Sequence, residues 1–293
     1  MSAPADAAPP DAGVRDVTVV TVAYRSDAVL PAMLDSVPAG VPVVVVDNDP
    51  ASPTPVPTDR LGLRTVRNAA NLGFGAACNR GAALADTPLV LFLNPDARLR
   101  GGAIEALLAA AARHPDAVAF NPIILDRRGR PHVKRRSVLV PRGRWLPRAV
   151  AGRAVEAPVL SGAAFLVRRA AFERVGGFDE AIFLYHEDDD LSLRLGHLGT
   201  LRLVPDAVVD HAEGRSTVRD AATAAWKGLH QGRSRVYAVR KHRVPFGVAR
   251  ALGGAVLGLL GALALSRRKR AKAAAYLRGV LDAAARSRPS GPT

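Results

Sequence analysis

The sequence predicts an α/β fold in which a mostly parallel sheet is covered by helices on both faces. Short, almost wholly apolar runs, typical of strands buried on both faces, alternate with segments of helical spacing. The 293 residues are 48% hydrophobic and 23% charged, which is the composition of a globular chain with a full core. The one cysteine, Cys78, excludes a disulfide framework and a cysteine-based zinc site.

Predicted strands alternate with predicted helices through the first half of the chain. The predicted strands cover residues 17–23, 43–46, 63–66 and 89–93. The predicted helices cover residues 27–37, 72–84 and 104–113. Ligands of such sheets bind beyond the carboxyl ends of the strands. Polar residues stand at those ends, namely Asp47, Asn48, Asn94 and Asp96, and this placement predicts a ligand site there.

A basic segment, residues 126–153, interrupts this alternation. Arg, Lys, Gly and Pro dominate it, which predicts an exposed loop or hairpin. Beyond it the pattern predicts strands at 159–167, 201–204 and 207–209, and helices at 170–175 and 187–198. Four acids open the last of these helices, where they suit the helix dipole.

The net charge of +15 is concentrated in two parts of the chain. The basic segment carries 10 basic and 1 acidic side chains, and residues 227–293 carry 15 and 1. The rest of the chain is mildly acidic. Basic regions of this kind favour a polyanion, which can be nucleic acid, acidic lipid or a phosphorylated substrate.

The two ends of the chain differ in composition from its middle. Residues 1–16 are rich in Ala, Pro and Asp and are expected to be disordered. They have neither the basic start nor the apolar core of a secretory signal, which favours a cytoplasmic protein.

Residues 251–265 form an unbroken run of apolar residues and glycines, shorter than the roughly 20 residues that span a bilayer. We expect a helix that lies on the anionic inner face of the cell membrane. The alternatives are a single span and a core helix with a solvated basic cap.

Eight short motifs occur in a characteristic order. They are Thr21-Val-Ala-Tyr24; Val46-Asp-Asn48; Asn71-Leu-Gly-Phe-Gly75 with Asn79-Arg-Gly81; Leu93-Asn-Pro-Asp-Ala97; Ser161-Gly-Ala163 with Arg168-Arg169; Gly176-Gly-Phe-Asp179; Glu187-Asp-Asp-Asp-Leu191; and His211 with Gly214 and Ser216. From about residue 17 to 242 the chain resembles the family 2 glycosyltransferases, especially their bacterial rhamnosyltransferase-like branch. The resemblance implies a GT-A fold, a nucleotide-sugar donor and inversion at the anomeric carbon.

The resemblance also implies roles for the polar strand ends. Asp47 would accept a hydrogen bond from the pyrimidine ring, and the alternative is an acid of the turn at the strand end. Asp96 would bind Mg²⁺ or Mn²⁺, although Asn94-Pro95-Asp96 could be only a tight turn. Asn94 stands where most of this fold class has a first Asp. His211 would complete the metal or diphosphate site, with a structural histidine as the alternative.

Asp188 is the candidate catalytic base, because the family's Glu-Asp pair aligns with Glu187 and Asp188. The same alignment places Glu187, Asp190 and Gly162 around the acceptor and leaves Asp189 as the unassigned position. Mutual repulsion among adjacent acids would raise a carboxylate pKa, which suits a base. The alternative is that these acids only stabilise a helix N-terminus.

Further residues are expected to flank the donor pocket. They are Thr21, Ala23, Tyr24, Asn71, Gly73, Asn79 and Arg80. Glycines there would allow close approach of the backbone, and packing at the helix start is the alternative. Trp145, Tyr185 and Trp226 could stack on sugars or pack in the core.

The expected organisation is a glycosyltransferase domain and a tail. The domain covers 17–226, with a donor half at about 17–97 and an acceptor half at about 98–226, and the basic, partly apolar helical tail covers 227–293. The expected reaction transfers a sugar from a nucleoside-diphosphate sugar to a hydroxyl of a glycan or polyprenyl-diphosphate-linked acceptor in cell-envelope synthesis. The resemblance suggests dTDP-rhamnose as the donor.

Two other classes of protein compete with this interpretation. A non-catalytic nucleotide-sugar-binding module would not need both Asp96 and Asp188. A nucleic-acid-binding protein would fit the charge, but aromatic content is 5% and no recognition motif is present. We therefore expect no nucleic-acid partner.

Overall fold

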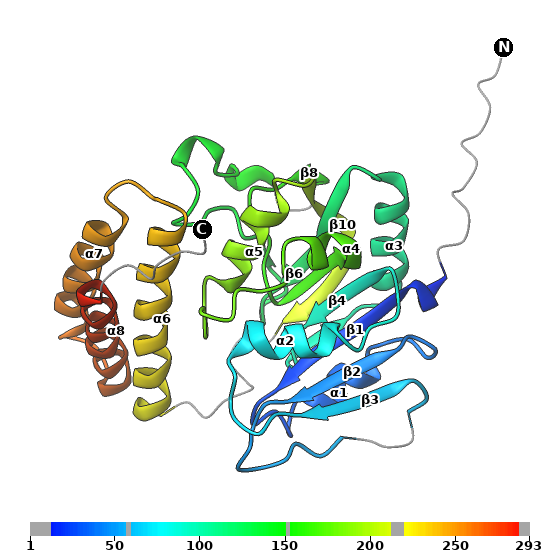
Figure 1. Ribbon diagram of the computed structural model, residues 1–293, viewed down its shortest axis with the longest axis horizontal. Coiled ribbons are helices and arrows are strands. Elements are labelled where there is room, and N and C mark those ends of the chain that lie inside the picture. Colours follow the sequence, from blue (N-terminus) through cyan, green and yellow to red (C-terminus); the bar gives the residue numbers. More distant parts are fainter. Residues whose placement is uncertain (1–12, 57–59, 151–152, 212–219, 287–293) are drawn as a thin grey trace.

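A single mixed sheet with helices on both faces forms the body of the molecule (Figure 1). The computed structural model describes residues 13–56, 60–150, 153–211 and 220–286. The described strands are β1 (Val17–Ala23), β2 (Val43–Asp47), β3 (Leu63–Arg67), β4 (Leu89–Leu93), β5 (Ala97–Leu99), β6 (Ala117–Leu125), β7 (Pro131–His132), β8 (Val155–Glu156), β9 (Ala164–Arg168) and β10 (Thr200–His211). Their order across the sheet is β3-β2-β1-β4-β9-β6-β10-β5, with β7 beside β6 and β8 beside β10.

The first four strands pair with one another in parallel, with β1 between β2 and β4 and β3 beside β2. Their β-branched and apolar side chains are buried on both faces in β1, β2 and β4. The register pairs Ala23 with Asp47, so the carboxyl ends of β1 and β2 lie together. Parallel pairing of β6 with β10 continues the pattern, and β9 and the short strands run antiparallel. The predicted mostly parallel α/β sheet is confirmed.

Helices cover the two faces of the sheet as predicted. The described α-helices are α1 (Leu30–Asp35), α2 (Phe74–Ala82), α3 (Ala103–Arg113), α4 (Arg169–Arg174), α5 (Glu187–Leu195), α6 (Ala221–Lys241), α7 (Gly247–Ala262) and α8 (Arg267–Ala285). Apolar side chains of α1 and α3 share one core cluster with the sheet. Those of α2, α4 and α5 share a second cluster on the other face. Both clusters are buried, and each is built from alternate residues of the same strands.

Several strands differ from the sequence prediction. The strand expected at 159–167 is β9, which begins only at Ala164, and the short strands β5, β7 and β8 were not predicted. The expected pair 201–204 and 207–209 is one continuous strand, β10, with a register shift between Val204 and Val208. Strand β6 was not predicted, because Asn121 and Pro122 interrupt its apolar run. Pro122 is tolerated because β9 pairs only with Ala119 and Phe120 of this strand.

The basic segment forms a short hairpin followed by turns, as its composition predicts. β7 pairs antiparallel with β6, and 3-10 turns follow at Arg142–Arg144 and Arg148–Val150. Val133 and Leu146 pack against the core cluster that contains α5. The segment is therefore tied to the helix that carries the candidate base.

The last three helices form an extension beside the body, with α6 lying between the body and the other two (Figure 1). Close approach between α6 and α8 depends on glycines. A Cβ on Gly232 would lie 2.3 Å from the carbonyl oxygen of Tyr276, and one on Gly279 would lie 2.1 Å from that of Leu229. A boundary after residue 226 would fall inside α6, so the helical extension begins at Ala221.

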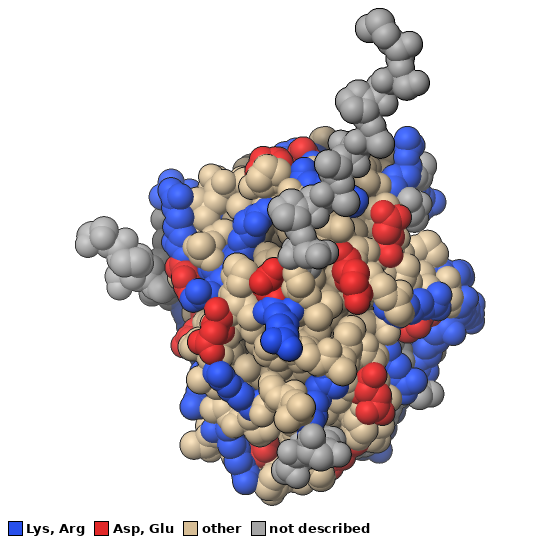
Figure 2. All heavy atoms as spheres, turned by 90° about the vertical axis from the view of Figure 1, so that its right-hand side faces the viewer, with Lys and Arg blue, Asp and Glu red and all other residues tan. Residues whose placement is uncertain are grey.

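None of the helices that the structure describes is long and apolar enough to cross a membrane. The expected disordered segment 1–16 lies almost wholly outside the described residues, apart from a 3-10 turn at Val14–Asp16. Figure 2 shows the face turned away from the extension, and acidic and basic side chains are interspersed across much of it.

Candidate active site

The carboxyl ends of β1 and β2 hold the residues expected to contact the nucleobase. Asp47 ends β2 and is 3% exposed. Its Oδ1 accepts a hydrogen bond from the Asp49 amide at 3.2 Å, and Arg67 Nε lies 3.8 Å from its Oδ2. Thr21 and Ala23 are fully buried within β1, whereas Tyr24, which follows this strand, has a partly exposed side chain. Asp47 therefore contacts the turn that follows β2, and it also lies at the carboxyl edge of the sheet, where a ligand is expected.

Asn48 organises the loop that follows β3. Its Oδ1 accepts hydrogen bonds from Asn68 Nδ2 at 2.8 Å and from the Leu72 amide at 3.1 Å. Its Nδ2 donates to Asn71 Oδ1 at 3.0 Å and to the Gly73 carbonyl at 3.2 Å. This network holds Asn71 beside the end of β2.

Gly73 lies at the start of α2 with a positive φ of 85°. A Cβ there would lie 2.3 Å from the carbonyl oxygen of Phe183, so only glycine fits. Phe183 lies just before the turn at Tyr185 and His186, which leads to the candidate base, Asp188. Gly73 thus joins the donor half of the site to the acceptor half by a backbone contact.

Asn79 and Arg80 have structural partners. Asn79 donates from Nδ2 to the Phe178 carbonyl at 2.9 Å and accepts from the Phe178 amide at 2.8 Å. Arg80 donates to Asn68 Oδ1 at 2.5 Å. These contacts support the packing alternative for both residues, and their donor contacts remain predictions.

The candidate metal residues meet where β4 and β10 end. His211 Nε2 lies 3.2 Å from Asp96 Oδ1 and 3.4 Å from Asn94 Nδ2. Asp96 is 8% exposed. Burial lowers the pKa of Lys227, and the charge of Asp96 opposes that shift. A carboxylate oxygen and an imidazole nitrogen therefore converge at one buried point.

This donor set fits a divalent cation that is completed by a substrate. Mg²⁺ is usually held by one or two protein carboxylates together with substrate phosphates and waters. Among the described residues no group of three or more His, Cys, Asp or Glu side chains is placed to hold a metal alone. The motif residues Gly214 and Ser216, which follow His211, lie outside the described residues.

The candidate base sits in the first turn of α5. The turn before it is strained, because Tyr185 and His186 have positive φ values of 68° and 70°. Asp188 Oδ2 accepts a hydrogen bond from the Gly162 amide at 2.9 Å, and its Oδ1 accepts from the Asp189 amide at 2.9 Å. A Cβ on Gly162 would lie 3.3 Å from that of Asp188, so the glycine allows this close approach.

The turn at residues 161–163 connects the base to the strand-end residues. The Asn94 amide donates to the Ala163 carbonyl at 2.9 Å. Asn121, from β6, holds the other side of the turn by accepting from the Ser161 amide at 2.6 Å. One short turn therefore contacts both Asn94 and Asp188, the start of the candidate metal motif and the candidate base.

Two acids of α5, Asp189 and Asp190, are paired with basic side chains, so the expected mutual repulsion does not raise their pKa values. Asp189 lies 2.9 Å from Lys134 Nζ and 3.0 Å from His186 Nδ1. Burial opposes ionisation of Asp189, but the charge of Lys134 and the hydrogen bond of His186 outweigh it and lower its pKa to about 2. Asp189 is thus a paired residue and not an unassigned position.

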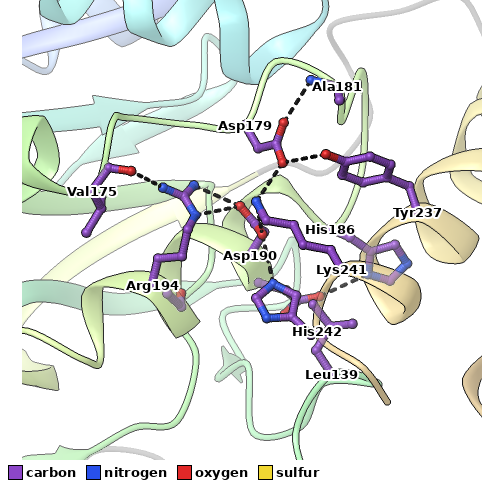
Figure 3. Close-up of polar contacts among 12 residues, drawn as sticks. Leu139, Val175, Asp179, Ala181, His186, Asp190, Arg194, Tyr237, Lys241 and His242 are labelled. Carbon is purple, nitrogen blue, oxygen red and sulfur yellow. Dashed lines mark hydrogen bonds and ion pairs between the residues drawn. The ribbon is translucent and has the colours of Figure 1, made fainter. Parts of the chain in front are cut away.

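Asp190 is the centre of an ion-pair network with the extension (Figure 3). Arg194 Nη2, Lys241 Nζ and His242 Nε2 lie 2.7, 2.7 and 2.8 Å from its carboxylate. Burial opposes ionisation, but hydrogen bonds from His242 and Lys241 and the charge of Arg194 lower the pKa of Asp190 to about 2. Lys241 also contacts Asp179 at 2.6 Å. The contacts of Asp190 are those of a structural junction.

Glu187 is the one acid of this turn whose pKa rises. Complete burial, reinforced by the charge of Asp188, raises the pKa of Glu187 to about 8. Its Oε2 has no hydrogen-bond partner in the described part of the chain. Glu187 is therefore a neutral carboxyl beside the candidate base at pH 7.

Sequence reasoning missed the cations that surround these acids. Lys134 comes from the basic segment, and Lys241 and His242 come from the end of α6. The only signal in the sequence that pointed toward these residues was the basic composition of the two regions.

Trp226 packs parallel to Tyr24 with ring centroids 6.5 Å apart and meets Phe183 at 5.5 Å.

Comparisons with known proteins identify the family of the chain. Residues 18–176 match the family described as Glycosyl transferase family 2. An N-acetylglucosaminyl-diphospho-decaprenol L-rhamnosyltransferase of Mycobacterium tuberculosis is 38% identical over 215 residues, which are 62% of this chain and 70% of the relative.

Solved structures share the fold at low identity. A mannosyltransferase from Pyrobaculum calidifontis with GDP-Man and Mn²⁺ matches with a TM-score of 0.54 and 20% identity, over 96% of this chain and 89% of that one. GalNAc-T7 with UDP, GalNAc and Mn²⁺ matches with a TM-score of 0.59 and 15% identity, over 93% of this chain and 57% of that one.

The fold is thus that of a GT-A glycosyltransferase. The chain belongs to glycosyl transferase family 2, and it is a glycosyltransferase of the rhamnosyltransferase-like kind.

Proposed function

We propose that the protein is an inverting glycosyltransferase that uses a nucleoside-diphosphate sugar. The observation that carries this proposal is the turn at residues 161–163, which contacts Asn94 on one side and Asp188 on the other. Asp96 and His211 lie beside Asn94. A donor whose diphosphate lies at Asp96 would therefore present its sugar toward Asp188.

The residues divide the reaction between them. Asp47 would hold the nucleobase, and Asp96 with His211 would hold Mg²⁺ or Mn²⁺. When bound, the metal supplies positive charge to the departing diphosphate. Asp188 would accept the proton of the acceptor hydroxyl as its oxygen attacks the anomeric carbon. The bond to the diphosphate breaks on the opposite face, and its electron pair leaves with the nucleoside diphosphate. One carboxylate is enough for this inverting displacement.

The same proposal includes a rhamnosyl donor and a polyprenyl-diphosphate-linked acceptor. The name of the M. tuberculosis relative supports both. The basic segment supports the acceptor, because it carries 10 basic side chains and reaches the candidate base through Lys134. Cell-envelope synthesis at the cytoplasmic face of the membrane is the setting that this chemistry fits.

We further propose that the extension lies on an anionic membrane surface. Helix α7 exposes large apolar side chains, with Leu257 71% and Leu260 58% exposed. Leu263 is 59% exposed, and Phe246 before the helix is 82% exposed. Contiguous apolar exposure of this kind is typical of an interaction site. A cluster of four basic residues begins α8 directly beyond it, which suits acidic head groups.

A donor screen tests the proposed reaction. Release of nucleoside diphosphate is measured over a panel of nucleotide sugars with Mn²⁺ and a polyprenyl-diphosphate-linked N-acetylglucosamine acceptor. We expect acceptor-dependent release of dTDP from dTDP-rhamnose. Release that is equal with all donors, or absent with every one of them, would contradict the proposal.

A further inference from the structure

Lys134 is ion-paired with Oδ2 of the proposed base, Asp188. Its Nζ lies 2.6 Å from Asp188 Oδ2 and 2.9 Å from Asp189 Oδ1. Its side chain is 20% exposed, and that of Asp188 is 17% exposed. This partly accessible ion pair connects the basic segment to the proposed base.

While this contact holds, both lone pairs of Asp188 Oδ2 are in use, one by the Gly162 amide and one by the Lys134 ammonium. A general base must lie about 2.6–3.2 Å from the oxygen whose proton it takes. Asp188 Oδ1 already accepts the Asp189 amide, and Oδ2 already accepts the Gly162 amide. The Lys134 ammonium stands at the remaining approach to Oδ2, at the distance an acceptor hydroxyl would take. The two groups cannot share that position.

Lys134 is held there as a cation. Burial lowers the pKa of Lys134, but the charges of Asp188 and Asp189 outweigh burial and raise it above its ordinary value. The ammonium therefore does not leave by losing a proton at working pH. Another anion must attract it.

We infer that Lys134 masks Asp188 until the diphosphate of a polyprenyl-diphosphate-linked acceptor draws it away. This inference rests on the proposed function and adds an acceptor-sensing residue to it. The basic segment that carries Lys134 supplies the positive surface that such a diphosphate would bind. Once Lys134 pairs with the diphosphate, the acceptor hydroxyl can take its place on Oδ2.

The chemical step stays balanced. The acceptor oxygen bonds to the anomeric carbon, the bond to the leaving diphosphate breaks, and the hydroxyl proton passes to Asp188. Lys134 keeps its protons throughout. Without an acceptor, the same masking keeps Asp188 from deprotonating water, so it suppresses hydrolysis of the donor.

Acceptor-free hydrolysis of dTDP-rhamnose with Mn²⁺, followed as dTDP release, tests the inference. Lys134→Met removes the ammonium and should raise this hydrolysis roughly tenfold, well below the 10²–10⁴-fold effect of a full general base. Lys134→Arg keeps the charge and should stay near the wild-type rate. Arg113→Met, at an exposed position at the end of α3 and outside the basic segment, is the matched control for loss of one charge and should change nothing.

The unaltered protein provides a second measurement. Farnesyl diphosphate offers a prenyl diphosphate without a sugar hydroxyl. At concentrations that leave dTDP binding unchanged, it should raise wild-type hydrolysis several-fold, and farnesol should not. If Lys134→Met does not fold, this response decides the matter.

The possible failures are distinguishable. A folded Lys134→Met variant that binds dTDP and hydrolyses the donor no faster than wild type overturns the inference and leaves the proposed function standing. No stimulation by farnesyl diphosphate overturns it likewise. Absence of acceptor-dependent transfer by the wild type removes the proposed function, and the inference falls with it.

Discussion

Glu187 and its three aspartate neighbours show how position, not residue type, sets the charge of a carboxyl. Asp189 and Asp190 each meet cations and hydrogen-bond donors, which hold their pKa values near 2. Glu187 is buried beside Asp188, and its pKa rises to about 8. The turn therefore contains a neutral acid followed by paired carboxylates, although the sequence shows four similar residues.

The raised pKa of Glu187 predicts how stability depends on pH. An unfolded Glu ionises near pH 4.3, whereas folded Glu187 keeps its proton to about pH 8. The folded state binds more protons within this window, so stability falls by about 1.4 kcal/mol per pH unit as pH rises through it. We expect Glu187→Gln to remove this slope. Urea unfolding at pH 5 and pH 8 measures it, and equal slopes in the two proteins would contradict the assignment.

Asp96 is predicted to matter for metal-dependent binding of the nucleotide. Its carboxylate and His211 are the described groups that fit a cation at the end of β4. Asp96→Ala should weaken calorimetric binding of dTDP in Mn²⁺, and binding in EDTA should be equally weak for wild type and variant. Wild-type binding that is the same with Mn²⁺ and with EDTA would show that the metal is not required.

At the level of elements, the junction between α5 and α6 depends on Asp190. It is fully buried and contacts the cations Arg194 and Lys241 as well as His242, so removal of its charge leaves the two cations without their common partner. We expect Asp190→Asn to lower the free energy of unfolding by about 3–5 kcal/mol, the cost typical of breaking a buried ion pair. Urea denaturation at pH 7 checks this.

The exposed pair of Asp210 with Arg100 provides the matched control. Asp210→Asn should change stability little, because surface ion pairs contribute little. The pKa of Asp190 is lowered in the folded state. The contribution of Asp190 to the free energy of unfolding should therefore persist above about pH 4 and disappear as pH falls toward 2. Equal stability of the two variants would show that the junction is not a stabilising contact.

The sequence predicted elements well where one physical signal dominates. Strand β1 at Val17–Ala23 and strand β4 at Leu89–Leu93 have the predicted bounds, because every residue in them is buried. Strand β6 was not predicted, because a proline such as Pro122 within an apolar run usually indicates that the run is not a central strand. The expected helical tail over 227–293 contains most of α6, but the helix begins at Ala221, six residues before the expected boundary.

The site was predictable in part for the same reason. Asp47, Asp96 and Asp188 could be placed because strand ends and motifs mark them. Lys134 could not, because 54 residues separate it from Asp188 and only the folded hairpin brings the two together. Long-range ion pairs carry no local pattern.

For the whole molecule, the distribution of apolar surface predicts where a membrane would be met. Leu257, Leu260 and Leu263 are exposed on the extension beside the basic start of α8. Replacing all three with Gln should greatly reduce co-sedimentation with vesicles that contain phosphatidylglycerol, and high salt should release part of the wild-type protein. Leu61→Gln, at an exposed leucine in the body, is the matched control and should bind like wild type. Equal binding of the triple variant and wild type would exclude this face as the contact.

Paired measurement of donor binding and turnover in Asp188→Asn tests the central claim most directly. Asn can still accept the Gly162 amide hydrogen bond, but it cannot take a proton. We predict a 10²- to 10⁴-fold loss of acceptor-dependent dTDP release, with dTDP binding in Mn²⁺ unchanged. Asp189→Asn, the neighbouring change on α5, should keep most of the rate. An Asp188→Asn enzyme that transfers the sugar at the wild-type rate would contradict the account.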